Sequence, residues 1–120
     1  MYAEIKLTTS DGDERTVPML ATASTPIRYK MLYGKDLMTS IIDQNGDFDL
    51  DVISKVAYLM ANQAAKVDMR TLDQDKYLEW LDTWDSMTFI DKSQEIFEIY
   101  LRSAENSSKA KKQGARLQGK

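Results

Sequence analysis

The chain has 120 residues, of which 42% are hydrophobic and 29% are charged, and its formal net charge at pH 7 is −3. This length and composition are typical of one globular domain and differ from those of disordered proteins. The absence of cysteine excludes disulfides and thiolate metal sites, and the absence of histidine removes the usual general base and most zinc or iron sites. No uncharged stretch approaches the roughly 20 apolar residues of a membrane span.

A β-hairpin is predicted first. Residues Tyr2–Thr9 partly alternate apolar and polar side chains, a pattern typical of a strand. Asp11-Gly12 favours a tight turn, because glycine accepts positive φ without steric cost. A second strand is expected over about residues 15–21, at a sheet edge or with a bulge, because Pro18 lacks the N–H that a ladder needs.

Two short helices are predicted next. Ser24 is placed to cap the first helix, which would run from Pro26 to about Tyr33 and end at a left-handed Gly34. Apolar residues at helical spacing predict a second short helix before a break at Asn45-Gly46. These apolar residues are Leu37, Met38, Ile41 and Ile42.

A longer helix is predicted to follow, with Asp49 as its N-cap. Its buried face would consist of Val52, Ile53, Val56, Leu59, Met60 and Ala64. Gln63 falls inside this apolar stripe. It would therefore either bond a neighbouring group or lie where the helix frays.

The last two predicted helices are also amphipathic. One would place the apolar residues Tyr77, Leu78, Trp80, Leu81, Trp84 and Met87 opposite Asp75, Glu79 and Asp82. The other would begin at about Ser93 and gather Ile96, Phe97, Ile99, Tyr100 and Leu101 on one side. The expected fold is therefore α+β and mainly α, with an N-terminal β-hairpin followed by a bundle of about five helices.

Residues 1–106 are predicted to form one domain, and residues 107–120 a flexible, disordered basic tail. The tail holds five of the 16 basic residues and no acids, so residues 1–106 hold 11 basic against 19 acidic residues, a net charge of −8. Contact of the tail with nucleic acid is possible through its charge. A solubilising terminus is favoured, because five charges on an acidic body bind nucleic acid weakly.

Two acidic patterns in the sequence have features of metal sites. Asp43–Asp51 resembles a calcium loop, but Phe48 stands at the position of the usual glycine and Ser54 at that of the bidentate glutamate. A solvated turn is favoured. Three carboxylates at helical spacing could serve acid–base or metal chemistry, although the same spacing is ordinary on a solvated face: Asp75, Glu79 and Asp82. The sequence thus predicts no catalytic, cofactor or metal site, and no enzyme.

Four residues are the candidate partner-binding residues: Trp80, Trp84, Met87 and Phe89. Aromatic and methionine side chains form either a core or an adaptable protein-binding surface. The core is the default interpretation, and recognition of a partner by at least one partly exposed tryptophan is the alternative.

Three segments, residues 21–30, 56–64 and 77–82, resemble in order and spacing the tail assembly chaperones of long-tailed, siphovirus-type phages and prophages of Gram-positive bacteria. The likeness extends from about residue 20 to residue 101. It implies a non-enzymatic protein of the host bacterial cytoplasm that binds the helical tape measure protein. Such a chaperone prevents aggregation of this client during tail tube assembly and is absent from the mature particle.

The resemblance also implies a homo-oligomer, or a co-oligomer with a frameshifted longer form. Composition and charge predict neither nucleic acid nor a membrane as a partner. Two functions of other classes are the alternatives. The first is a structural tail or neck component that stays in the virion. The second is a small metal-dependent hydrolase.

Overall fold

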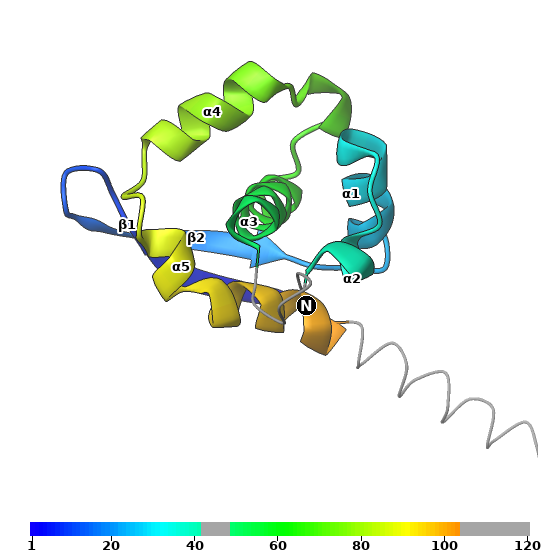
Figure 1. The fold of residues 1–120 in the computed structure, drawn as a ribbon, viewed down its shortest axis with the longest axis horizontal. Helices are drawn as coiled ribbons and strands as arrows, with labels where there is room; N and C mark the ends of the chain where they lie inside the picture. Colours follow the sequence, from blue (N-terminus) through cyan, green and yellow to red (C-terminus); the bar gives the residue numbers. More distant parts are fainter. Residues whose placement is uncertain (42–48, 104–120) are drawn as a thin grey trace, which may run out of the picture.

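The computed structural model describes residues 1–41 and 49–103 (Figure 1). Its elements are β1 (Tyr2–Thr8), β2 (Glu14–Leu20), α1 (Thr25–Tyr33), α2 (Leu37–Ser40), α3 (Leu50–Ala64), the 3-10 helix η1 (Met69–Thr71), α4 (Gln74–Asp82) and α5 (Thr88–Asp91). A further helix covers residues 93–103. The expected α+β architecture, a hairpin followed by helices, is confirmed, and the described residues contain six α-helices.

The hairpin buries one face and exposes the other. Ile5 lies opposite Val17 and Leu7 opposite Arg15, so the odd-numbered residues of both strands share the face that joins the core. Pro18 lies opposite Glu4 on the exposed face. Because the described sheet has two strands, each strand has an open edge, and the proline fits there as predicted.

Helix α3 lies at the centre of the molecule, against β2 and among the other helices (Figure 1). Its N-terminus is capped as predicted, because the Asp49 carboxylate accepts the backbone N–H of Asp51 at 2.9 Å. Gln63 bonds its neighbours, which decides between its two predicted roles. Its Oε1 accepts the hydroxyl of Thr25 at 2.8 Å, and its Nε2 donates to the hydroxyl of Thr22 at 3.3 Å.

The prediction for α1 is confirmed at the C-terminal end of the helix but not at its N-terminal cap. Gly34 ends the helix with φ of 72° and donates to the Lys30 carbonyl at 2.7 Å, so the left-handed C-cap is confirmed. Ser24 occupies the N-cap position, but the predicted capping bond is wrong. Its backbone is helical, and its hydroxyl accepts the Arg28 Nε at 3.0 Å instead of a helix N–H.

One expected helix is interrupted. The apolar spacing predicted a single helix from Tyr77 through Met87, whereas α4 ends at Asp82 and α5 begins at Thr88. The intervening backbone pairs with the hairpin. Ser10 donates to the Thr83 carbonyl and Asp85 donates to the Thr8 carbonyl, both at 2.9 Å, and these two bonds enclose a bridge between Thr9 and Trp84.

The helix of residues 93–103 completes the core beside β1. Ile96, Phe97, Ile99 and Tyr100 are buried as predicted. Leu101 is 40% exposed, so its predicted place on the buried side is wrong. The Ser103 hydroxyl donates to the Ala21 carbonyl at 3.1 Å, which fixes this helix to the chain just after β2.

Several predictions fall outside the described residues: Ile42, the break at Asn45-Gly46, most of the calcium-like segment Asp43–Asp51, and the tail at 107–120. None of the described helices combines the length and apolar composition that a membrane crossing requires.

Candidate protein-binding groove

The four predicted partner-binding residues differ in how far they are buried. Trp84 and Phe89 are only 8% and 4% exposed, whereas Trp80 is half-buried and Met87 is 51% exposed. The Trp80 ring centroid lies 5.3 Å from that of Tyr58, 5.8 Å from that of Trp84 and 5.6 Å from that of Phe89. The aromatic cluster therefore packs α4 onto the core. Partner binding by Trp80 and Met87 stays a prediction.

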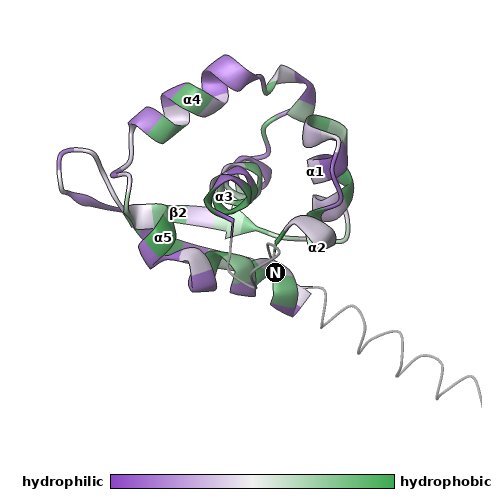
Figure 2. Cartoon of the chain, in the orientation of Figure 1, coloured by the Kyte–Doolittle hydropathy of each residue, from purple (hydrophilic) through white to green (hydrophobic). Residues whose placement is uncertain are grey.

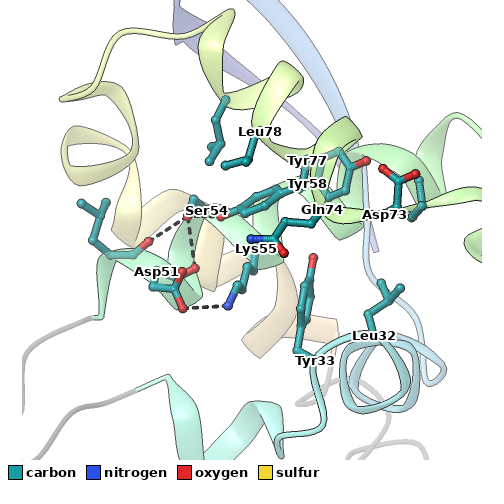
Figure 3. A pocket seen from close by; sticks show the side chains of 13 residues that line it. Leu32, Tyr33, Asp51, Ser54, Lys55, Tyr58, Asp73, Gln74, Tyr77 and Leu78 are labelled. Atoms are coloured by element: carbon teal, nitrogen blue, oxygen red, sulfur yellow. Dashed lines mark hydrogen bonds and ion pairs between the residues drawn. The ribbon is translucent and has the colours of Figure 1, made fainter.

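A groove with a volume of about 720 Å³ lies between α1, α3 and α4 (Figure 3). Five leucines line it: Leu32, Leu50, Leu72, Leu78 and Leu81. Three tyrosines join them: Tyr33, Tyr58 and Tyr77. The polar lining residues are Asp51, Ser54, Lys55, Asp73 and Gln74. The groove is therefore predominantly apolar and aromatic, and its polar lining residues belong to α3 and to the start of α4.

The ends of α4 hold this helix in place as the outer wall. At its start, the Asp73 carboxylate accepts the backbone N–H of Lys76 at 2.8 Å. At its end, the chain is fixed to the hairpin by the bridge between Thr9 and Trp84. Hydrophilic and hydrophobic residues alternate along α4 (Figure 2). On its exposed side, Leu78 keeps 46% of its surface in solvent at the mouth of the groove.

A buried hydrogen bond joins α3 to α4 beneath the groove. The Ser54 hydroxyl lies 2.8 Å from the Tyr77 hydroxyl and 3.1 Å from the carbonyls of Leu50 and Asp51. Burial raises the pKa of Tyr77. The phenol therefore stays neutral at physiological pH and holds the two helices together as a hydrogen-bonding group.

Lys55 forms part of the wall between α1 and α3. Its Nζ lies 2.8 Å from the Asp51 carboxylate and 5.0 Å from the ring centroid of Tyr33 (Figure 3). Burial also raises the pKa of Tyr33. The ammonium is thus compensated both by a carboxylate one helical turn away and by an aromatic face.

The acidic residues on α4 do not gather into a centre. Asp75, Glu79 and Asp82 are all exposed. Within residues 1–41 and 49–103, no group of three or more His, Cys, Asp or Glu side chains is arranged to hold a metal ion.

Comparisons with protein-family models, curated proteins and solved structures found no match for this chain.

The sequence did not mark the groove residues as a set. Leu32, Tyr33, Leu50 and Leu72 belong to three different segments, and nothing in their spacing places them together. Leu50 offered one signal, because it is a large apolar residue outside the apolar stripe of α3, and the structure leaves it 44% exposed. A large apolar residue off the buried face of a helix is a useful sign of a binding surface.

Replacement of Tyr77 by phenylalanine should lower the free energy of unfolding by about 1 kcal/mol, because a buried hydrogen bond to Ser54 is lost. Urea denaturation measures this change. Tyr2→Phe is the matched control, because the Tyr2 side chain is 56% exposed and its hydroxyl bonds Glu4 at the surface. Equal destabilisation by the two changes would contradict a structural role for the Ser54 contact.

Proposed function

We propose that the chain is a phage tail assembly chaperone that binds the tape measure protein and prevents its aggregation during tail tube assembly. In this role it is absent from the mature particle and acts in the host bacterial cytoplasm. The observation that carries the proposal is the apolar groove between α1, α3 and α4. Grooves of this type receive the apolar face of an amphipathic helix.

The location of the family-like segments supports the proposal. Residues 21–30 include most of α1, residues 56–64 lie in α3, and residues 77–82 lie in α4. The segments that resemble tail assembly chaperones therefore belong to the three helices that line the groove. Leu50 and Leu78 are exposed at the rim of the groove, so packing of the core does not explain why these positions hold leucine.

A holding role suits this geometry. A long helical client exposes apolar faces before the tube encloses it, and such faces aggregate unless they are covered. Each copy of this chain would cover one short segment. A homo-oligomer, or a co-oligomer with a frameshifted longer form, would multiply weak contacts along an extended client.

Co-expression with the neighbouring tape measure gene tests the proposal. The wild-type chain should keep the tape measure protein soluble, and Leu78→Asp should return most of it to the insoluble fraction, because a carboxylate then faces the client's apolar surface. Leu101→Asp is the matched control, since Leu101 is exposed to a similar degree on a different helix.

Deletion of the gene from the phage provides the complementary result. Unchanged tape measure solubility and unchanged tail formation in the deletion would refute the chaperone role. Mass spectrometry of purified particles should detect none of the chain. Stoichiometric amounts in the particle would instead assign it to the structural components of the tail or neck.

A further inference from the structure

The rim of the groove is acidic. Leu78 lies exposed at this rim. Asp75 precedes it by three residues and Asp82 follows it by four, so both carboxylates share its face of α4. Both aspartates are exposed to solvent. An apolar partner that reaches Leu78 therefore meets a negative charge on either side of it along the helix.

The interior of the groove adds to this charge. Asp51 and Asp73 line it, and Lys55 is the one cationic residue among those that line it. Lys55 is paired with Asp51 at 2.8 Å. The groove and its rim together thus hold four carboxylates against one ammonium, and they favour a partner that is both apolar and cationic.

The outer side of α1 carries basic residues, in contrast to the acidic rim of the groove. Ile27 and Met31 lie one helical turn apart and are 62% and 69% exposed. At 3.6 residues per turn, Arg28 and Lys30 fall on the two sides of this pair. We call these four residues the α1 ridge. No acidic residue occurs between residues 24 and 35, so the ridge is an apolar strip between two cations.

Neighbouring residues extend the positive charge. Arg28 and Met31 line a second surface hollow together with Lys66, Asp68 and Arg70. Arg70 is paired with Asp68 at 3.0 Å, while Lys66 is exposed. The surface around the ridge is therefore basic, whereas the groove on the other side of α1 is acidic.

We infer that the α1 ridge of one copy binds in the groove of a second copy. The inference rests on the proposed function, which includes self-association, and it identifies the two surfaces through which the copies bind. Helices α1 and α4 each have nine residues and are about 14 Å long, so the ridge, which spans roughly 6 Å of α1, fits within the length of the groove wall. Ile27 and Met31 meet the leucines and tyrosines of the groove, and the flanking cations meet its acidic rim.

The contact is heterologous, because it joins two different surfaces of the same chain. Every bound copy still offers one unoccupied ridge or groove, so association continues beyond the dimer unless a ring closes. A ridge and a client helix also compete for one groove. A free chaperone would thus cover its own apolar binding surface, and the client would displace the neighbouring copy.

The basic tail is a poorer occupant of the groove. It provides five cations, but Leu117 is the single large apolar residue after residue 103. A segment with one such residue cannot supply the paired apolar contacts that Ile27 and Met31 offer. The complementarity in both charge and apolar surface therefore favours the ridge.

Sedimentation velocity of the full chain tests this inference. The wild-type mass should rise with protein concentration beyond that of a dimer, and less steeply at high salt, because salt screens the charged rim. A groove variant, Asp75→Lys with Asp82→Lys, and a ridge variant, Arg28→Glu with Lys30→Glu, should each associate at least about tenfold more weakly. Asp11→Lys with Asp13→Lys, at the hairpin turn, is the matched control and should associate as the wild type does.

Mixing the groove variant with the ridge variant should restore association. In the mixture each groove finds a ridge of opposite charge, whereas each variant alone juxtaposes like charges. Circular dichroism of the separate variants checks that both are folded. Met31→Asp provides a second test of the ridge, because this side chain is 69% exposed and the core does not depend on it.

Four results would overturn the inference. The first two are a wild-type chain that stays monomeric at all concentrations, and groove and ridge variants that associate as the wild type does. The other two are a mixture of the variants that stays monomeric, and loss of association when Lys109, Lys111 and Lys112 are changed to glutamine. The last result would assign the groove to the tail. These measurements involve no client, so their failure leaves the tape measure experiment as an independent test of the chaperone role.

Discussion

Replacement of Phe97 by alanine should lower the free energy of unfolding by about 3–5 kcal/mol. The Phe97 side chain is fully buried in the core cluster, in the middle of the helix of residues 93–103. Its truncation removes an aromatic ring and leaves a cavity in the core cluster that the surrounding side chains fill only in part. Chemical denaturation followed by circular dichroism measures the change in midpoint.

Leu101→Ala is the control for this experiment. Leu101 lies one turn after Phe97 on the same helix, but 40% of its surface is exposed. We expect a smaller loss, of about 1 kcal/mol, because a large part of the Leu101 side chain stays in water in the folded chain. Similar losses for the two variants would show that helix propensity, and not docking of Phe97, determines the contribution of this helix.

Stability should also fall steeply above pH 10. Burial raises the pKa of Tyr29 to about 12, and it raises the pKa of Tyr33 further in the same direction. A tyrosine in the unfolded chain ionises near about pH 10. Between these values the folded chain holds more protons than the unfolded chain, so stability is complete below pH 10. It then declines by about 1.4 kcal/mol per pH unit for each such tyrosine.

Urea denaturation at a series of pH values measures this decline, and absorbance of the tyrosinate ion follows ionisation at the same time. Tyr29→Phe should make the decline less steep, because one of the buried phenols no longer titrates. Complete ionisation of the tyrosines near pH 10 without unfolding would contradict the burial of Tyr29 and Tyr33.

The sequence predicted those parts of the fold that local chemistry determines. The Asp11-Gly12 turn, the left-handed Gly34 and the Asp49 cap each depend on a residue's own conformational or hydrogen-bonding preference. The stripe of α3 depends on a regular period over fifteen residues. Such signals lie within a few residues of the structure that they specify, so they can be recognised without the rest of the chain.

Contacts between distant segments could not be predicted in this way. Helical spacing continues from Tyr77 through Met87, yet the open edge of β1 pairs with the backbone around Trp84 and ends α4 at Asp82. The groove exists because this pairing sets the path of α4 relative to α1 and α3. Leu78 belongs to the apolar face by periodicity, and only the tertiary arrangement leaves it exposed.

The bridge between Thr9 and Trp84 also determines when the groove can form during synthesis. The backbone N–H of Thr8 donates to the hydroxyl of Thr88 across a separation of 80 residues. The segment that pairs with the hairpin around Trp84 is therefore made long after the hairpin itself. A nascent chain with only the hairpin, α1 and α3 has no outer wall. Contacts of such separation form slowly, and the binding surface can form only after the segment around Trp84 and Thr88 has been made.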